Sequence, residues 1–176
     1  MNVRKKNNQE LVFSSKANVL KLLKNSLKKS KVEKLLYFTI SEWREDEVEI
    51  LRKIRKFFLS KVIIRSSAIG EDGLEKSEAG KFLSILNINP NSKTKLKNAI
   101  ESVIASYGKN LNLKNQVLIQ SQSKNVLTSG VLFTRTPDLG SPYYVINYQE
   151  GNRTDAVTKG EIGNTIKIFR GINHRR

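Results

Sequence analysis

The chain has 176 residues and a formal net charge of +16, from 32 lysines and arginines against 16 aspartates and glutamates. It contains no cysteine, which excludes disulfides, thiolate catalysis and cysteine-based metal sites. The single histidine, His174, argues against a histidine-rich metal site or a serine–histidine triad. No apolar run approaches the roughly 20 residues that span a bilayer, and the basic start lacks the apolar stretch of a secretory signal. We therefore expect a soluble cytoplasmic protein with no membrane partner.

The positive charge is typical of proteins that bind a polyanion, such as nucleic acid or a phosphate-bearing ligand. In this chain the excess is spread out. Residues 1–60 carry 15 basic and 7 acidic groups, residues 61–108 carry 7 and 5, and residues 109–176 carry 10 and 4. An aromatic stacking platform and the known recognition motifs are missing, which argues against nucleic acid. A polyanion-binding module stays as an alternative, and we interpret most of the excess as surface charge.

Apolar periodicity predicts three helices. The first begins at Ser14 or Ser15, either of which can cap its N-terminus. The second covers residues 41–59, with acids early and bases late, the order that complements a helix dipole. Its expected buried stripe is Val48, Leu51, Ile54 and Phe58. The third follows Asn91 or Ser92, and its expected stripe is Leu96, Ile100, Val103, Ile104 and Tyr107.

Short apolar runs predict strands between and after these helices. They lie at residues 35–40, 62–64, 82–88, 117–120, 130–134, 143–148 and 165–169. Helices and strands alternate up to Gly108 and strands with turns follow, which predicts a mixed α/β or α+β fold. We expect a loose N-terminus at 1–10, an α/β lobe at 11–108 and a strand-rich lobe at 109–176.

The segment with the clearest chemistry is the predicted strand that ends in Arg65-Ser66-Ser67. It presents a fixed cation and two hydroxyls at a strand end, and the planar guanidinium suits a phosphate better than a flexible lysine does. Glu71 and Asp72 follow closely and could hold the arginine or approach a divalent metal. An arginine that simply pairs with these acids is the other interpretation.

Weaker signals lie on either side of that strand. Gly80, in a small-residue turn, lets backbone N–H groups approach a ligand closely, although the Walker A spacing is absent. Lys16 stands at the start of the first helix, where free helical N–H groups beside a lysine make an anion site. Ser129 and Thr134 lie at the two ends of a later predicted strand. The sequence of that strand is also typical of an ordinary hairpin.

Three segments, taken in order, resemble one family over about residues 12–140. FSSKANVLKLL looks like the lysine motif, usually Gly-Gly-Lys at a helix start, of pyruvate phosphate dikinase and phosphoenolpyruvate synthase. VIIRSSAIGEDGLEKSEAGKFLSILNI resembles the family's Arg-Ser-Ser-Ala, Glu-Asp and Ser-x-Ala-Gly series with matching spacing. VLIQSQSKNVLTSGVLFTRTPDLG resembles its Val-x-x-Gln hinge strand followed by Ser-Gly-Val-x-Phe-Thr. The Arg-Ser-Ser block is the most specific of the three.

The resemblance implies an ATP-grasp-like, two-lobed domain that binds Mg-ATP and passes a phosphoryl group to a histidine on a separate domain. That group then travels to pyruvate on a third domain. Arg65 would be the catalytic cation, because it neutralises charge as the bond breaks. The implied ATP-binding residues are Lys16 and Arg65 at the phosphates, Ser67 beside them, Glu71 supporting the loop, Gly80 over the phosphates, Gln120 near the adenine, and Ser129 and Thr134 on the nucleotide floor.

This sequence departs from the family pattern at several points, two of which bear most on the site. Ser14 and Ser15 stand where the family has glycines. The family's acidic metal ligands, its second phosphate-binding arginine and its phosphohistidine and pyruvate domains lie beyond Arg176, so we expect a domain incomplete at its C-terminus whose Mg²⁺ ligands lie outside this chain. Whether this chain is itself an enzyme stays open. A non-catalytic relative that acts as an interaction module is the alternative.

Overall fold

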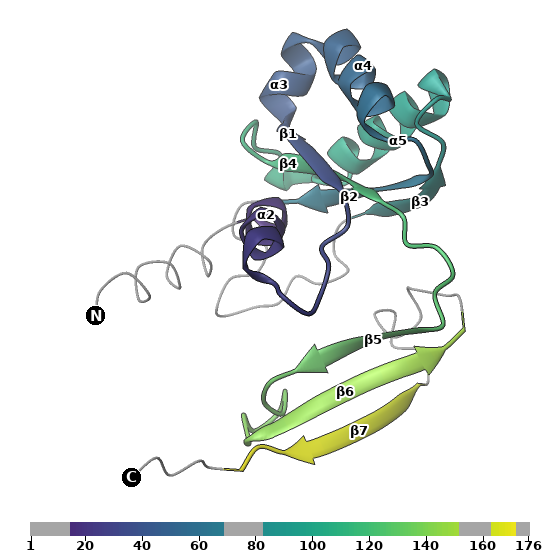
Figure 1. Ribbon diagram of the computed structural model, residues 1–176. Helices are drawn as coiled ribbons and strands as arrows, with labels where there is room; N and C mark the ends of the chain where they lie inside the picture. Colours follow the sequence, from purple (N-terminus) through teal and green to yellow (C-terminus); the bar gives the residue numbers. More distant parts are fainter. Residues whose placement is uncertain (1–14, 69–82, 152–162, 172–176) are drawn as a thin grey trace. The chain divides into compact units, whose positions relative to one another are not determined.

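The computed structural model describes residues 15–68, 83–151 and 163–171. The chain forms two compact units, Met1–Gln122 and Ser123–Arg176, and each contains one antiparallel sheet (Figure 1). We expected a lobe boundary between residues 108 and 109. The chain divides after Gln122 instead, because strand β4 (Gln116–Ser121) pairs with two strands of the first unit. The arrangement is a mixed α+β fold, as the sequence predicts.

The first unit is built on a four-stranded sheet in the order β1-β4-β2-β3. Its other strands are β1 (Leu35–Thr39), β2 (Val62–Ser67) and β3 (Ser84–Ile88). The described helices are α2 (Lys16–Ser26), α3 (Ile40–Glu45), α4 (Glu47–Phe57) and α5 (Lys93–Ala105), followed by the short 3-10 helix η1 (Gly108–Asn110). Figure 1 shows α3, α4 and α5 on one side of this sheet and α2 on the other. Among the described residues, no helix is both long and apolar enough to cross a membrane.

Local capping explains where the helices begin. Ser15 caps α2, as expected, by accepting from the amide of Asn18. Thr39 ends β1 and caps α3 in a capping box with Glu42, so the predicted strand 35–40 stops one residue early. Ser92 precedes α5 at the expected position, without a side-chain capping bond.

The helix expected over residues 41–59 is two helices. Asp46 ends α3 and its carboxylate accepts from the amide of Glu49, which starts α4 in a new direction. This break moves Val48 off the buried stripe, and its side chain is 67% exposed. Ile50 takes its place beside Leu51 and Ile54.

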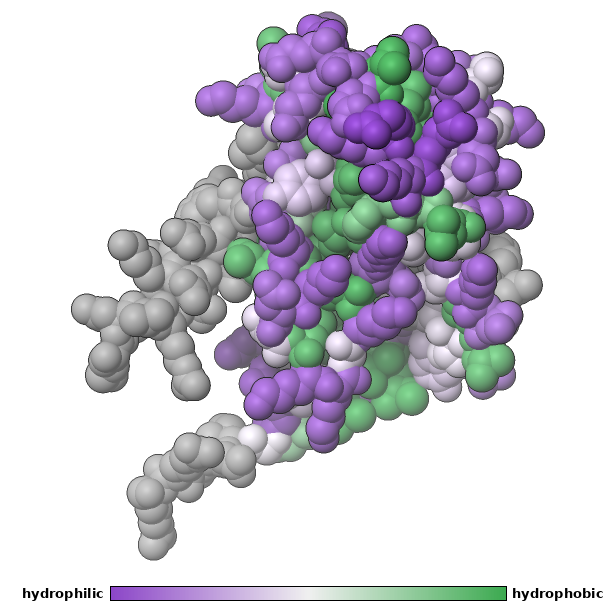
Figure 2. All heavy atoms as spheres, turned by 45° about the horizontal axis from the view of Figure 1, so that its top comes forward, coloured by the Kyte–Doolittle hydropathy of each residue, from purple (hydrophilic) through white to green (hydrophobic). Residues whose placement is uncertain are grey.

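The core of the first unit lies between the sheet and α3, α4 and α5. Because side chains alternate across a strand, Val62 and Ile64 of β2 and Val117 and Ile119 of β4 enter this core. The whole predicted stripe of the third helix is buried in it: Leu96, Ile100, Val103, Ile104 and Tyr107. Hydrophilic side chains cover the outer surface of the helices in Figure 2. The apolar pattern of the sequence therefore accounts for this layer.

The second unit is a three-stranded sheet in the order β5-β6-β7. The strands are β5 (Thr128–Phe133), β6 (Tyr143–Glu150) and β7 (Asn164–Phe169), close to the predicted ranges. Gly130 pairs with Tyr148 in register, and a Cβ at this glycine would overlap the carbonyl oxygen of Asn147. The glycine thus lets two backbones approach closely.

Replacing Asp46 with alanine removes the only side-chain cap that the structure shows at the start of α4. We expect the free energy of unfolding to fall by about 1 kcal/mol, as for other capping residues. Urea denaturation followed by circular dichroism measures the change. Asp46→Asn is the matched control, because asparagine caps equally well. An alanine variant as stable as the asparagine variant would contradict the role of this cap.

Replacing Gly130 with alanine should destabilise the second unit by about 1–3 kcal/mol, since the added methyl must displace the backbone of β6. Amide hydrogen exchange of β5 and β6 measures the loss. Gly171→Ala is the matched control, because a Cβ at Gly171 meets nothing within 4 Å and the backbone shows no left-handed φ. Equal exchange rates in the two variants would show that the close approach at Gly130 is unimportant.

Candidate functional site

The face of the first sheet that points away from α3, α4 and α5 carries three of the polar residues singled out from the sequence, Arg65, Ser67 and Gln120. Val62 and Ile64 of β2 lie in the helical core. Because side chains alternate along a strand, Arg65 and Ser67 lie on the opposite face. Gln116 and Gln120 of β4 share it, since Ser67 pairs with Gln116. We call this the β2–β4 polar face.

Helix α2 is attached to one end of this face through two buried hydrogen bonds. The amide of Ala17 donates to Ser67 Oγ at 2.9 Å, and Ser15 Oγ donates to Gln116 Oε1 at 2.5 Å. Ser15, Ser67 and Ala17 are all nearly inaccessible to solvent. Lys16 lies between the two attached residues, at the first position of α2. Residues from distant parts of the sequence therefore hold this lysine beside the end of β2.

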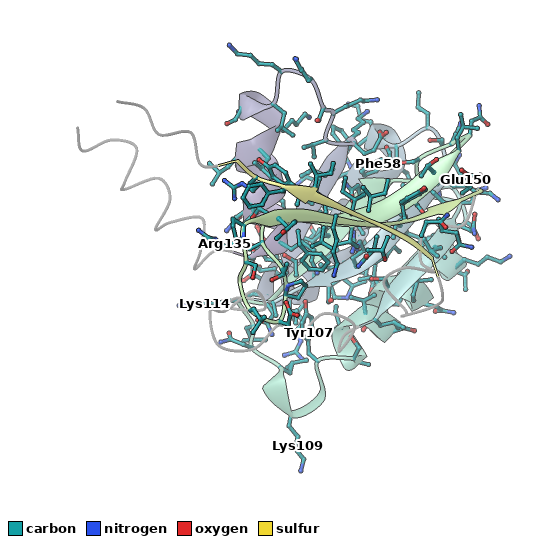
Figure 3. The ribbon with its side chains drawn as sticks, turned by 90° about the horizontal axis from the view of Figure 1, so that it is seen from below. Phe58, Tyr107, Lys109, Lys114, Arg135 and Glu150 are labelled. Carbon is teal, nitrogen blue, oxygen red and sulfur yellow. The ribbon has the colours of Figure 1, made fainter. Side chains whose placement is uncertain are left out.

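Tyr107 ties the same end of the face together from the opposite side of the sheet. Its hydroxyl accepts from the amide of Ser67 at 2.8 Å and donates to the carbonyl of Gln116 at 2.6 Å. The side chain is 2% exposed and is labelled in Figure 3, where Lys109 of the following segment extends outward. A single hydroxyl thus bridges the two residues whose side chains hold α2.

Arg65 lies in the middle of the polar face, half-buried, opposite Leu118 of β4 and Ser84 of β3. Within the described part of the chain its side chain makes no hydrogen bond or ion pair, whereas its main chain belongs to the β2 ladder. The alternative of an arginine paired with Glu71 or Asp72 involves acids outside the described residues. A guanidinium has five N–H donors in a planar fork, a geometry that suits bidentate binding of an anion.

The expectation of free helical N–H groups beside Lys16 is corrected by the structure. The amide of Ala17 is used by Ser67 Oγ, and the amide of Asn18 is used by Ser15 Oγ. These are the amides that an anion at a helix N-terminus would use. Neither amide is therefore available to an anion at the start of α2.

The other predicted site residues are placed as follows. Gln120 is half-buried on the polar face, at the end opposite Lys16 and diagonal to Arg65. Ser67 is fully buried, so its hydroxyl acts within the protein. Ser129 belongs to β5 of the second unit, and Thr134 follows that strand, with its carbonyl accepting from Arg170. Glu71 and Gly80 lie outside the described residues.

The donor set of the polar face suits the phosphates of a nucleotide better than it suits a metal. It offers a guanidinium, an ammonium and side-chain amides, which are donors to phosphate oxygens. A divalent cation such as Mg²⁺ needs several oxygen ligands. In residues 15–68, 83–151 and 163–171, no group of three or more histidine, aspartate or glutamate side chains could hold a metal ion.

Two residues of this arrangement, Tyr107 and Gln116, were not identified as site residues from the sequence. Tyr107 was interpreted as one more member of an apolar helical stripe, and its ring does pack in the core. Gln116 is separated by 101 positions from Ser15, its hydrogen-bond partner. A polar residue at the first position of a buried strand was the only available signal, and it is a weak one.

Comparison with known protein families agrees with the motifs. The family described as pyruvate phosphate dikinase, AMP/ATP-binding domain, matches residues 4–165 of this chain. No curated protein matches the chain. The family match covers most of the sequence and includes α2, β2 and β4, which build the polar face. The chain therefore belongs to the pyruvate phosphate dikinase AMP/ATP-binding domain family.

Proposed function

We propose that the chain binds ATP through the β2–β4 polar face. In this proposal it is the ATP-grasp-like, two-lobed domain of a cytoplasmic phosphotransferase related to phosphoenolpyruvate synthase and pyruvate phosphate dikinase. The observation that carries the proposal is Arg65, a half-buried guanidinium without a partner in the described part of the chain. Desolvating a charge without pairing it is costly. A bound phosphate would offset that cost, which supports a ligand at this position.

The order of residues along the face supports one orientation of the nucleotide. Lys16 stands beside Ser67 at one end, Arg65 lies in the middle, and Gln120 lies at the other end. Alternate residues of a strand are about 7 Å apart, so Arg65 lies about that far from Ser67, the residue to which the start of α2 is attached. We place the triphosphate at Lys16 and Arg65 and the adenine toward Gln120. Ser67 contributes indirectly, because its hydroxyl holds the start of α2.

The remaining members of the proposed site come from outside this face. The roles of Ser129 and Thr134, and of Glu71 and Gly80, rest on the family resemblance alone. The chemistry needed from Arg65 is electrostatic, since phosphoryl transfer depends on positioning and on neutralising the charge of the transferred group. The phosphoryl acceptor would be a histidine on a separate phosphohistidine domain that delivers to a pyruvate-type domain. Mg²⁺ would require ligands beyond the described residues.

Replacing Arg65 with alanine should weaken Mg-ATP binding by about 1.5–3 kcal/mol, roughly 10- to 150-fold in Kd, as expected for a hydrogen-bonded charge. Isothermal titration calorimetry of the purified chain measures the affinity. Arg52→Ala is the matched control. It removes the same charge, but Arg52 is exposed and paired with Glu49 on α4. The control should bind Mg-ATP like the unmodified chain.

The same pair of variants separates the proposal from its alternatives. A polyanion-binding module would lose affinity equally in both variants, and its binding would fall steeply with salt because counterions are released. An interaction module would show no Mg-ATP binding in any of the three proteins. Either outcome would refute ATP binding at Arg65.

A further inference from the structure

We propose that Tyr107 is a positioning residue for the nucleotide-binding face. Its hydroxyl fixes the ends of β2 and β4 against each other where α2 attaches, and so sets the position of Lys16 relative to Arg65. The inference rests on the proposed function for its effect on ATP affinity. Its effect on the attachment of α2 is independent of that function.

The hydroxyl of Tyr107 connects the ends of two strands. It binds the main chain of two residues, Ser67 and Gln116, at 2.8 and 2.6 Å. The side chains of those same residues are the ones that hold α2, through Ala17 and Ser15. A movement of either strand end is therefore passed directly to the first turn of the helix. Lys16 lies within that turn.

Burial makes the bridge effective. Tyr107 is 2% exposed, Ser67 is 0% exposed and Gln116 is 9% exposed, so water cannot easily replace the lost oxygen. A buried amide without an acceptor is unfavourable, and Ser67 must then shift or admit water. Either response disturbs its Oγ, which accepts from Ala17. Loss of the hydroxyl therefore disturbs the start of α2, whereas the aromatic ring contributes only to packing in the core.

The serine at position 15 makes the chain's attachment of α2 dependent on side chains. Ser15 both caps the helix and donates to Gln116, whereas the glycine found there in the family pattern could do neither. The position of Lys16 in this chain therefore relies on a network with Tyr107 at its base. Packing of the tyrosine ring would be preserved by phenylalanine, so the two roles can be separated.

The experiment compares Tyr107→Phe with the unmodified full chain. We expect the Mg-ATP Kd to rise about five- to tenfold, the size of effect that a lost buried hydrogen bond produces. We also expect amide hydrogen exchange to speed up selectively at Ala17 and Asn18 relative to the amides of α5. Ile54→Val is the control. It removes one buried methyl-sized group from α4 in the core, away from the network.

A second variant, Gln116→Leu, protects the test against a tyrosine variant that folds poorly. It removes the amide that accepts from Ser15 but keeps the main-chain carbonyl that Tyr107 uses. It should reproduce the selective exchange at the start of α2 and the weaker Mg-ATP binding. Ile54→Val should leave the affinity unchanged and raise exchange only as global stability falls.

The outcomes distinguish the two proposals. Selective exchange at Ala17 with no Mg-ATP binding by the unmodified chain would reject the proposed function and support the attachment role. Binding by the unmodified chain that Tyr107→Phe weakens no more than Ile54→Val does would overturn the positioning role. Exchange at Ala17 that only follows global stability in both network variants would overturn it as well.

Discussion

The pairing of β4 with both β1 and β2 is the constraint on which the first unit depends. It joins residues 116–121 to residues 35–39 and 62–67, and bringing such distant segments together costs loop-closure entropy. On one face of the sheet, burial of Val117 and Ile119 in the helical core offsets that cost. On the other face the same pairing places Gln116 against Ser67, and α2 can then attach. Stability and the candidate site thus arise from opposite faces of one strand.

Strand alternation also separates the cations of the proposed site from the general surface charge. The net charge is +16, and the proposed site uses two of these cations, Lys16 and Arg65. Many other cations lie on exposed helix surfaces, such as Arg52 and Lys53, which pair with Glu49. Exposed pairs of this kind contribute little to stability. Burial and position, rather than net charge, mark Arg65 as the residue to test.

Much of the fold could be predicted from the sequence because it rests on local patterns. The stripe from Leu96 to Tyr107 and the apolar strand runs identified the core, and the motifs identified the family. The division at Asp46 was missed, since one carboxylate decided it and the amphipathic pattern over residues 41–59 looked continuous. Lys16 and Arg65 were named from the sequence and stay predictions, whereas the residues that position them were not named. Tyr107 and Gln116 act through contacts with residues 40 and 101 positions away, which periodicity does not reveal.

The most direct test of ATP binding at the polar face is a nuclear magnetic resonance titration of the chain, with arginine side chains labelled by ¹⁵N. The Nε–H signal of Arg65, assigned by comparison with an Arg65→Lys variant, is followed as Mg-ATP is added. Our account predicts a saturable shift of this signal, larger than that of Arg52, because phosphate binds the Arg65 guanidinium. A saturable shift elsewhere, with the Arg65 signal unmoved, would contradict it.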